Sequence, residues 1–564
     1  MNRFDSRWST LAVAAALLLA TPTAAQIHDP RALDADPTTA EGPIAPVLEG
    51  LGDHHYEVTT SSPQSQRFFD QGLRLTYAFN HSEALRAFKE AARLDPDNAM
   101  AYWGWALVLG PNLNLPMMPY VVEQAWEAVQ KAVALSEGVS EKERALIEAL
   151  ATRYTDDPEA DRTPFDEAYA EAMAIVVVRY PDDLDVATLY AAALMNLSPW
   201  DYWYLDGLAK ENTDEVLATL ESVVERDPHH PGALHYYIHA VEARHPDRAE
   251  PHADNLATLM PGAGHIVHMP SHIYMRVGRY ADSWEANRKA VEADESYITQ
   301  CRAQGLYPLG YYPHNIHFMA WSAAFQGRRE AAMEASRKIV AEIPHELAAD
   351  RNTWALYETF LSQPLYTMVR FGMWTDVLAE PVPGVDSRFM TGIWHYARAL
   401  ARVHGEGDLE AAREELAALH ESRGAVDEED AYSIGFGDVE RLLTIAIEIA
   451  EREIAAAEGD HAAAVAHLER AVRLEDSLLY NEPPDWYFPV RHVLGAILLE
   501  AGRPEEAEVV YWADLRKNPD NGYSLFGLKQ ALEAQGRLDE ALAMKARFDA
   551  AWAEAAHELT TSRV

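Results

Sequence analysis

The sequence predicts an all-α protein built as a solenoid of repeated helix-turn-helix units. Three observations favour this fold class. From Ser65 to Asn98, apolar residues recur at helical spacing in two blocks that end at Asp95-Pro96. Glycine-arginine pairs mark similar turns further along, at 278–279, 327–328, 502–503 and 536–537. No stretch shows the clear alternation of apolar and polar residues that is typical of a half-buried strand.

The best-defined unit carries small, aromatic and helix-ending residues at fixed offsets, namely Phe68, Gly72, Leu75, Ala84, Phe88, Ala91 and Pro96. Gly72 and Ala84 are small where two helices would cross, Phe88 fills the space beside them, and Pro96 cannot continue the helix. These are the offsets of a repeat of about 34 residues, and the chain resembles the tetratricopeptide repeat (TPR) family over nearly all of residues 65–555. It also resembles a group of exported bacterial TPR proteins, which supports the fold and not a function.

The N-terminus predicts export. Arg3 and Arg7 precede an apolar run from Leu11 to Ala20, and Thr23-Ala24-Ala25 offers small residues at a cleavage site. We therefore interpret residues 1–25 as a cleavable signal peptide and expect a periplasmic or secreted protein. The remaining organisation is predicted as a flexible acidic and proline-rich lead-in (26–64), an N-terminal TPR array with a histidine-rich groove (65–345) and a C-terminal TPR array (346–560).

The amino-acid composition restricts which binding partners and which metal or disulfide sites the protein can have. The formal net charge is −42, so phosphate backbones and anionic lipid surfaces are repelled and nucleic acid is excluded as a partner, whereas cations are attracted. The single cysteine, Cys301, can form neither an internal disulfide nor a cysteine-rich zinc site. After signal cleavage no apolar segment is long enough to span a membrane.

Histidines recur at the same positions of successive repeats. If three repeats begin at Pro231, Gly264 and Pro313, the second, fifth and ninth positions share one helix face with the twelfth. The side chains at these positions are His265 and His314 (second), His235, His268 and His317 (fifth), His239 and His272 (ninth) and Glu242 (twelfth). The TPR resemblance implies that this face lines the concave groove of the solenoid.

Such a set predicts a transition-metal site, because imidazole suits zinc, copper, iron and nickel. His235/His239 and His268/His272 are pairs at i and i+4, and Glu242 would complete a set of two histidines and one carboxylate that suits non-haem iron. The predicted metal ligands are His235, His239, Glu242, His265, His268, His272, His314 and His317. Zinc, copper and iron stay open. Nearby Met269, Met275 and Met319 would favour copper, with core packing as the alternative.

Three functions remain open at this stage. The first is an exported TPR solenoid that binds a protein or peptide partner of the cell envelope, or a ligand, in its groove and holds a metal at the histidines. The second is a metal-dependent enzyme, oxidative or hydrolytic, with its centre in the same groove; no catalytic residue can be assigned, since only Glu242 or Tyr236/Tyr237 could act as a base. The third is a plain protein-interaction scaffold without metal. The segment 293–312, which lengthens the spacing between two repeats, is expected to form a lid.

Overall fold

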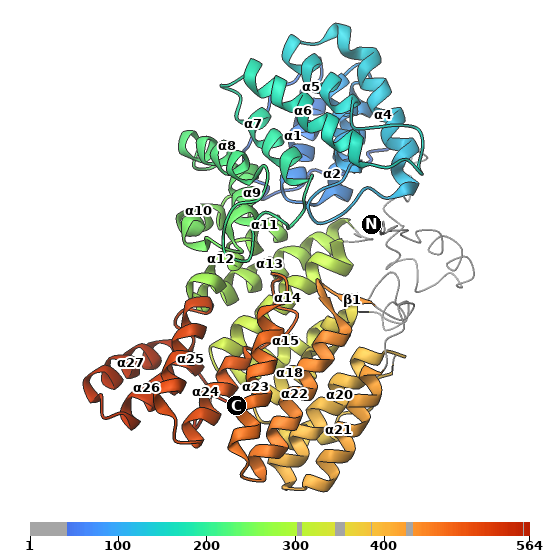
Figure 1. Ribbon diagram of the computed structural model, residues 1–564. Coiled ribbons are helices and arrows are strands. Elements are labelled where there is room, and N and C mark those ends of the chain that lie inside the picture. Colours follow the sequence, from blue (N-terminus) through green and yellow to red (C-terminus); the bar gives the residue numbers. More distant parts are fainter. Residues whose placement is uncertain are drawn as a thin grey trace, which may run out of the picture. The chain divides into compact units, whose positions relative to one another are not determined.

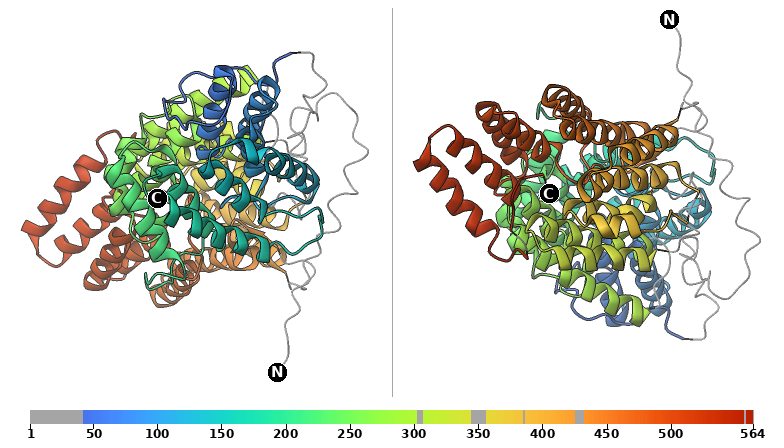
Figure 2. Two further views of the ribbon diagram at one scale, coloured as in Figure 1. Left: turned by 90° about the horizontal axis from the view of Figure 1, so that it is seen from above. Right: turned by 90° about the horizontal axis from the view of Figure 1, so that it is seen from below.

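A computed structural model describes residues 42–301, 307–343, 356–384, 386–424, 432–556 and 558–563. The predicted signal peptide, residues 1–25, lies outside these ranges. The described chain is all-α, and its consecutive helices pack side by side as hairpins (Figure 1). Views from above and below show the same pairing of successive helices (Figure 2). The predicted fold class, a helical-repeat solenoid of TPR-type units, is confirmed.

The described chain divides into two compact units, one ending at Asn315 and the other beginning at Ile316. The division lies upstream of the boundary between two arrays that the sequence suggested near residue 345. The two units share α14, which begins in the first and ends in the second.

The N-terminal unit contains the following elements in chain order: α1 (Pro63–Tyr77), α2 (His81–Leu94), α3 (Ala99–Leu109), η3 (Pro119–Val121), α4 (Val122–Leu135), η4 (Ser136–Gly138), α5 (Glu141–Ala151), α6 (Thr163–Arg179), α7 (Leu184–Met195), α8 (Thr213–Arg226), α9 (Pro231–Val241), η5 (Pro246–Ala249), α10 (Glu250–Leu256), α11 (Gly264–His268), α12 (Pro270–Val277), α13 (Tyr280–Cys301), the π-helical turn η6 (Tyr307–Tyr311) and the start of α14 (Tyr312–Phe325).

The C-terminal unit continues from α14 with these elements: α15 (Arg329–Glu342), α18 (Leu356–Arg370), α19 (Trp374–Ala379), α20 (Arg388–Ala401), the π-helical turn η7 (Arg402–Glu406), α21 (Leu409–Arg423), β1 (Ser433–Ile434), β2 (Gly437–Asp438), α22 (Val439–Ala457), α23 (His461–Asp476), α24 (Val490–Glu500), α25 (Pro504–Lys517), α26 (Gly522–Ala534) and α27 (Leu538–Ala551). The two short strands pair antiparallel, with Ser433 opposite Asp438 and Ile434 opposite Gly437.

The packing inside the first hairpins follows the residues that suggested the repeat. Phe88 is fully buried, and its ring occupies the space where a Cβ on Gly72 of α1 or Gly104 of α3 would stand. Asn80 and Asn98 cap the next two helices by accepting hydrogen bonds from the backbone N–H groups of Glu83 and Ala101. Small residues therefore permit the close helix crossings, as the sequence predicted.

Part of the predicted lead-in belongs to the folded unit. Between residues 42 and 62 the chain forms neither helix nor strand, and Leu51, Tyr56 and Val58 are buried in the main hydrophobic core. Gln71 fixes this segment by accepting a hydrogen bond from the backbone N–H of Leu48 and donating one to the carbonyl of Pro46. This part of the predicted lead-in therefore packs on the N-terminal unit, because its apolar side chains gain burial against α1 and its neighbours.

Across the described ranges, no helix combines the length and apolar character needed to cross a bilayer.

Candidate metal centre

The first histidine pair lies on α9. Pro231 occupies the first turn of this helix, and the side chain of His230 caps it by accepting a hydrogen bond from the backbone N–H of Ala233. His235 and His239 then follow at i and i+4 on one face, and Glu242 lies at the C-cap. All three of these side chains are buried.

The second set of histidines lies on α11 and α12, which replace the single first helix that the sequence predicted. The division falls at Met269 and Pro270, and the backbone of Met269 keeps helical angles (φ −50°, ψ −38°). His268 and His272 therefore still face one another as an i, i+4 pair, and His265 lies one turn earlier. His314 approaches the same pair from α14, with its ring centroid 4.8 Å from that of His268.

Four of these imidazoles have an oxygen within 2.9 Å of Nδ1. His235 Nδ1 donates to the Tyr77 carbonyl at the C-terminus of α1 (2.6 Å), and His268 Nδ1 donates to Asn287 Oδ1 (2.6 Å). The Asn287 amide is oriented because its Nδ2 donates to the Ser283 carbonyl. The oxygens near Nδ1 of the other two rings, His239 and His272, belong to the Glu242 carboxylate.

Glu242 contacts one histidine of each pair. Its Oε1 lies 2.9 Å from His239 Nδ1, and its Oε2 lies 2.6 Å from His272 Nδ1. An oxygen at Nδ1 fixes the tautomer with the proton on that nitrogen, so Nε2 carries a lone pair. Two rings from two different helices are therefore oriented by a single carboxylate.

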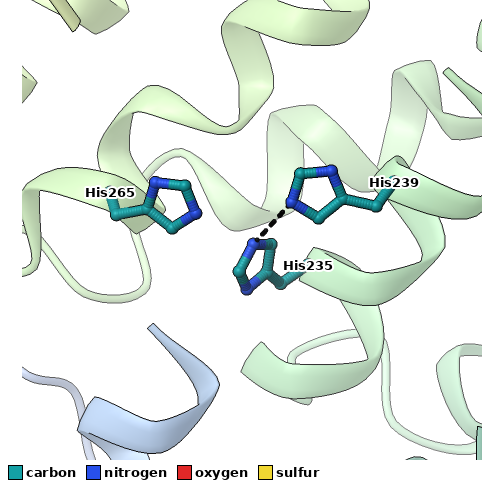
Figure 3. A group of neighbouring side chains, drawn as sticks. All are labelled: His235, His239 and His265. Carbon is teal, nitrogen blue, oxygen red and sulfur yellow. Dashed lines mark hydrogen bonds between the residues drawn. The ribbon is translucent and has the colours of Figure 1, made fainter. Parts of the chain in front are cut away.

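The Nε2 atoms of each i, i+4 pair face one another. They are 3.1 Å apart between His235 and His239, joined by the dashed line in Figure 3, and 2.8 Å apart between His268 and His272. Two nitrogens that bind one ion at about 2.0–2.1 Å are roughly 2.9–3.4 Å apart for ordinary ligand angles. The observed spacings are close to this range.

His265 completes the first set. It comes from α11 and faces the ring of His235, with the two ring centroids 5.0 Å apart (Figure 3). The side chain is 2% exposed, and within the described part of the chain neither of its ring nitrogens has a hydrogen-bond partner. A buried imidazole without such a partner loses hydration without compensation, so it points to a ligand at this position.

The nitrogens form two groups of three. Atoms of His235, His239 and His265 lie within 4.8 Å of one another, and the same holds for His268, His272 and His314. We name these the α9 group and the α12 group. The structure places Glu242 behind both groups, where it orients rings through Nδ1, rather than among the converging nitrogens.

His317 is placed apart from these groups. It belongs to the C-terminal unit, where its ring stacks on Tyr487 at a centroid distance of 5.4 Å and packs edge-on against Phe360. Burial lowers the pKa of His317 to about 3. His317 is in neither group of three nitrogens.

Aromatic side chains cover the α9 group. The ring of Phe79, between α1 and α2, is 4.4 Å from that of His235, Trp200 is 5.1 Å from His239, and Tyr311 is 4.6 Å from His265. Segments from three different parts of the chain therefore cover this group. Tyr311 lies in the stretch predicted as a lid, of which residues 302–306 are outside the description.

Two of the covering residues adopt an unusual backbone conformation. Phe79 and Trp200 both have positive φ angles, 53° and 64°, although neither is glycine. Such conformations cost of the order of 1–3 kcal/mol each and persist where the surroundings enforce them, often at functional sites. A small apolar cavity of about 60 Å³ is lined in part by Phe79, Leu85, Tyr307 and Tyr311, two of which also contact the α9 group.

Burial keeps the rings neutral. It lowers the pKa values of His235, His265 and His268 well below the ordinary histidine value, and the neighbouring imidazoles lower them further. Burial alone would raise the pKa of Glu242, but His272 and His239 outweigh it and lower that pKa. The site therefore combines neutral nitrogen donors with one carboxylate.

A second histidine cluster has a structural explanation. His54 Nε2 lies 2.8 Å from Asp185 Oδ1, and His230 Nε2 lies 3.5 Å from the same oxygen. His230 Nδ1 already accepts the N-cap hydrogen bond, so its Nε2 carries the proton and cannot bind a metal. Tyr77 also donates to Asp185, so this network holds the C-terminus of α1 in place.

Several groups that orient or cover the histidines could not be predicted from the sequence. The Tyr77 carbonyl is a backbone atom 158 residues before its partner, and Asn287, Phe79 and Trp200 show no spacing that relates them to the histidines. No local signal could have identified them. Met269, one of the methionines that suggested copper, belongs to the hydrophobic core.

Comparisons with known proteins give only distant likenesses. No family model and no curated protein matches the chain. Among solved structures, a human IFIT1 dimer with m7Gppp-AAAA is 14% identical, with coverage of 89% of this chain and 92% of that one and a TM-score of 0.29. The Cut9–Hcn1 hetero-tetramer of the APC/C is 12% identical (83% and 76% covered, TM-score 0.31). The TPR domain of P58(IPK) is 12% identical (84% and 98% covered, TM-score 0.21). Likenesses of this size carry no argument about function.

Proposed function

We propose that this protein binds transition-metal ions in its N-terminal unit, through the buried histidine cluster on α9, α11, α12 and α14. The observation that carries the proposal is the paired Nε2 atoms, 3.1 and 2.8 Å apart, of rings whose Nδ1 atoms each lie within 2.9 Å of an oxygen. Metal-binding histidines characteristically direct the other ring nitrogen to a carbonyl or carboxylate in this way.

The alternative to a metal is a proton between each pair of nitrogens. With both Nδ1 atoms protonated, two neutral rings would direct lone pairs at one another, which is repulsive. A proton would relieve this repulsion only by creating an imidazolium in a fully buried site, which desolvation opposes. A metal cation satisfies both lone pairs at once.

Binding is better supported than catalysis. Three histidines leave a coordination position open, as in catalytic zinc sites. However, Glu242 already contacts two Nδ1 atoms and is not available as a general base. Zinc, copper and iron all suit such a donor set, so the metal is left for measurement.

The cellular setting is part of the proposal and depends on the sequence alone. The signal-peptide pattern of residues 1–25 supports export to the periplasm or beyond. The repeat architecture supports a protein or peptide partner in the cell envelope, because helical-repeat arrays commonly present extended binding surfaces.

The test is elemental analysis of protein purified from its native compartment without a histidine tag. We expect stoichiometric zinc, copper or iron in the wild type, and its loss in a His235→Ala/His268→Ala double variant. His252→Ala, which removes an imidazole of the same unit outside the cluster, is the matched control and should keep its metal. Protein that holds no metal and takes none up when dialysed against each ion would favour the plain scaffold instead.

A further inference from the structure

The histidine cluster contains two complete sets of ligands. The α9 group and the α12 group each bring three nitrogens within 4.8 Å of one another, and both belong to the N-terminal unit. Each group combines an i, i+4 pair with a third histidine from another helix: His265 of α11 joins the pair on α9, and His314 of α14 joins His268 and His272. Three imidazoles are sufficient to hold one ion in a tetrahedral site with an open position.

The two groups are neighbours. The ring centroids of His239 and His272 are 5.7 Å apart, and those of His265 and His268 are 5.8 Å apart. Each of these distances joins a ring of one group to a ring of the other. Two ions held by the two groups would therefore lie close enough to interact directly.

We propose that the cluster is a two-ion centre, with one transition-metal ion in the α9 group, one in the α12 group, and Glu242 linking them through the Nδ1 atoms of His239 and His272. This inference rests on the proposed function and adds the number of ions and their coupling.

Glu242 suits the linking role because its charge lies between the two groups. It is completely buried, and the two oxygens contact different rings. A carboxylate at Nδ1 makes the imidazole a better donor at Nε2, and removal of such a partner typically costs about 10- to 100-fold in metal affinity. One negative charge also reduces the repulsion between two nearby cations.

The two sites differ in access. The α9 group is buried throughout and lies beneath Phe79, Trp200 and Tyr311. The α12 group includes His314, which is half-buried. We therefore expect the ion of the α12 group to exchange with a chelator first, and the ion of the α9 group to exchange more slowly.

The decisive experiment is a titration of metal-free protein with Co²⁺, followed by visible absorption and by elemental analysis after gel filtration. The wild type should bind two equivalents. His265→Ala and His314→Ala should each retain one, and Glu242→Gln should weaken both by about 10- to 100-fold. Glu221→Gln is the matched control, because Glu221 accepts from Tyr237 at the surface of the same unit and does not touch the cluster.

The outcomes separate this inference from the proposed function. One equivalent in the wild type, abolished by either single variant, would overturn the two-ion centre and leave metal binding intact. If the wild type binds no Co²⁺, both the two-ion centre and the proposed metal-binding function are contradicted. Should a variant fail to fold by circular dichroism, the wild type loaded with Cu²⁺ gives an independent answer. Electron paramagnetic resonance should show signal broadening on going from one to two equivalents, and two equivalents without broadening would contradict adjacent ions.

Discussion

At the scale of single residues, Asp294 carries an unusual charge state. Its carboxyl group is buried on α13, where Oδ1 accepts from the Tyr307 hydroxyl and Oδ2 accepts from Asn315 Nδ2, both at 2.7 Å. These two donors favour the ionised form, but burial outweighs them and raises the pKa of Asp294 to about 7, with a smaller contribution from Glu295. The folded protein therefore keeps this acid protonated at mildly acidic pH.

Asp294 should consequently contribute a loss of stability as the pH rises between about 4 and about 7, opposite in sign to the gain from the buried neutral histidines. In the unfolded chain Asp294 ionises near its ordinary pKa of 3.8, whereas the folded protein ionises it only near 7, so the folded state binds the extra proton in this window. At about 1.4 kcal/mol per pKa unit, the loss is a few kcal/mol. Asp294→Asn removes this contribution, so the free energy of unfolding, measured in urea from pH 4 to pH 8, should rise more steeply with pH than in the wild type. Asp282→Asn, on the same helix but half exposed, should not, and equal slopes in all three proteins would contradict the assignment.

At the scale of elements, two glycines determine how close the helices of the site can come. Gly232 lies in the first turn of α9, and the Tyr77 ring occupies the space of its missing Cβ, which brings the Tyr77 carbonyl to His235. Gly264 begins α11, and a Cβ there would overlap the Asp294 carboxylate. In both cases the absence of a side chain permits a contact that orients a histidine-bearing helix.

Gly264→Ala should therefore displace α11 and weaken metal binding while the fold persists. Overpacking of this kind costs typically about 1–3 kcal/mol and shifts backbone, and α11 carries both His265 and His268. We expect a drop in Co²⁺ affinity of tenfold or more, measured by titration, with an unchanged far-ultraviolet circular dichroism spectrum. Gly138→Ala, where an added Cβ meets open space, is the control. Wild-type affinity in Gly264→Ala would show that α11 adapts without moving its histidines.

At the scale of the whole molecule, the charge and the division into units predict where a metal acts. A net charge of −42 raises the local concentration of cations, and the proposed ligands all lie in the N-terminal unit. A ligand that binds only the folded state stabilises it by about 2.7 kcal/mol at a concentration 100 times its Kd.

Addition of Zn²⁺ should therefore slow amide hydrogen exchange in the N-terminal unit only. Amides of α9, α11 and α12 should exchange more slowly with the ion, because their opening must release it. Amides of α22 to α25 in the C-terminal unit serve as the internal reference and should be unaffected. Equal protection in both units would point to general cation binding by the acidic surface rather than to the histidine cluster.

The sequence by itself determined the local features of this protein. The helical period, the small residues at helix crossings and the stop at Asp95-Pro96 defined the fold class. The same period brought His235 to His239, and His268 to His272, because residues four apart on a helix are neighbours.

Only the tertiary structure decided which of these local sets meet. His265 lies with the pair on α9 and His314 with the pair on α12, although both occupy the second repeat position. His317 belongs to the other unit, although it shares the fifth position with His235 and His268. The Tyr77 carbonyl, Asn287 and the aromatic cover came from distant segments. The physical reason is that helix crossings and loop closures depend on packing between residues far apart in the chain, for which a single sequence carries no periodic signal.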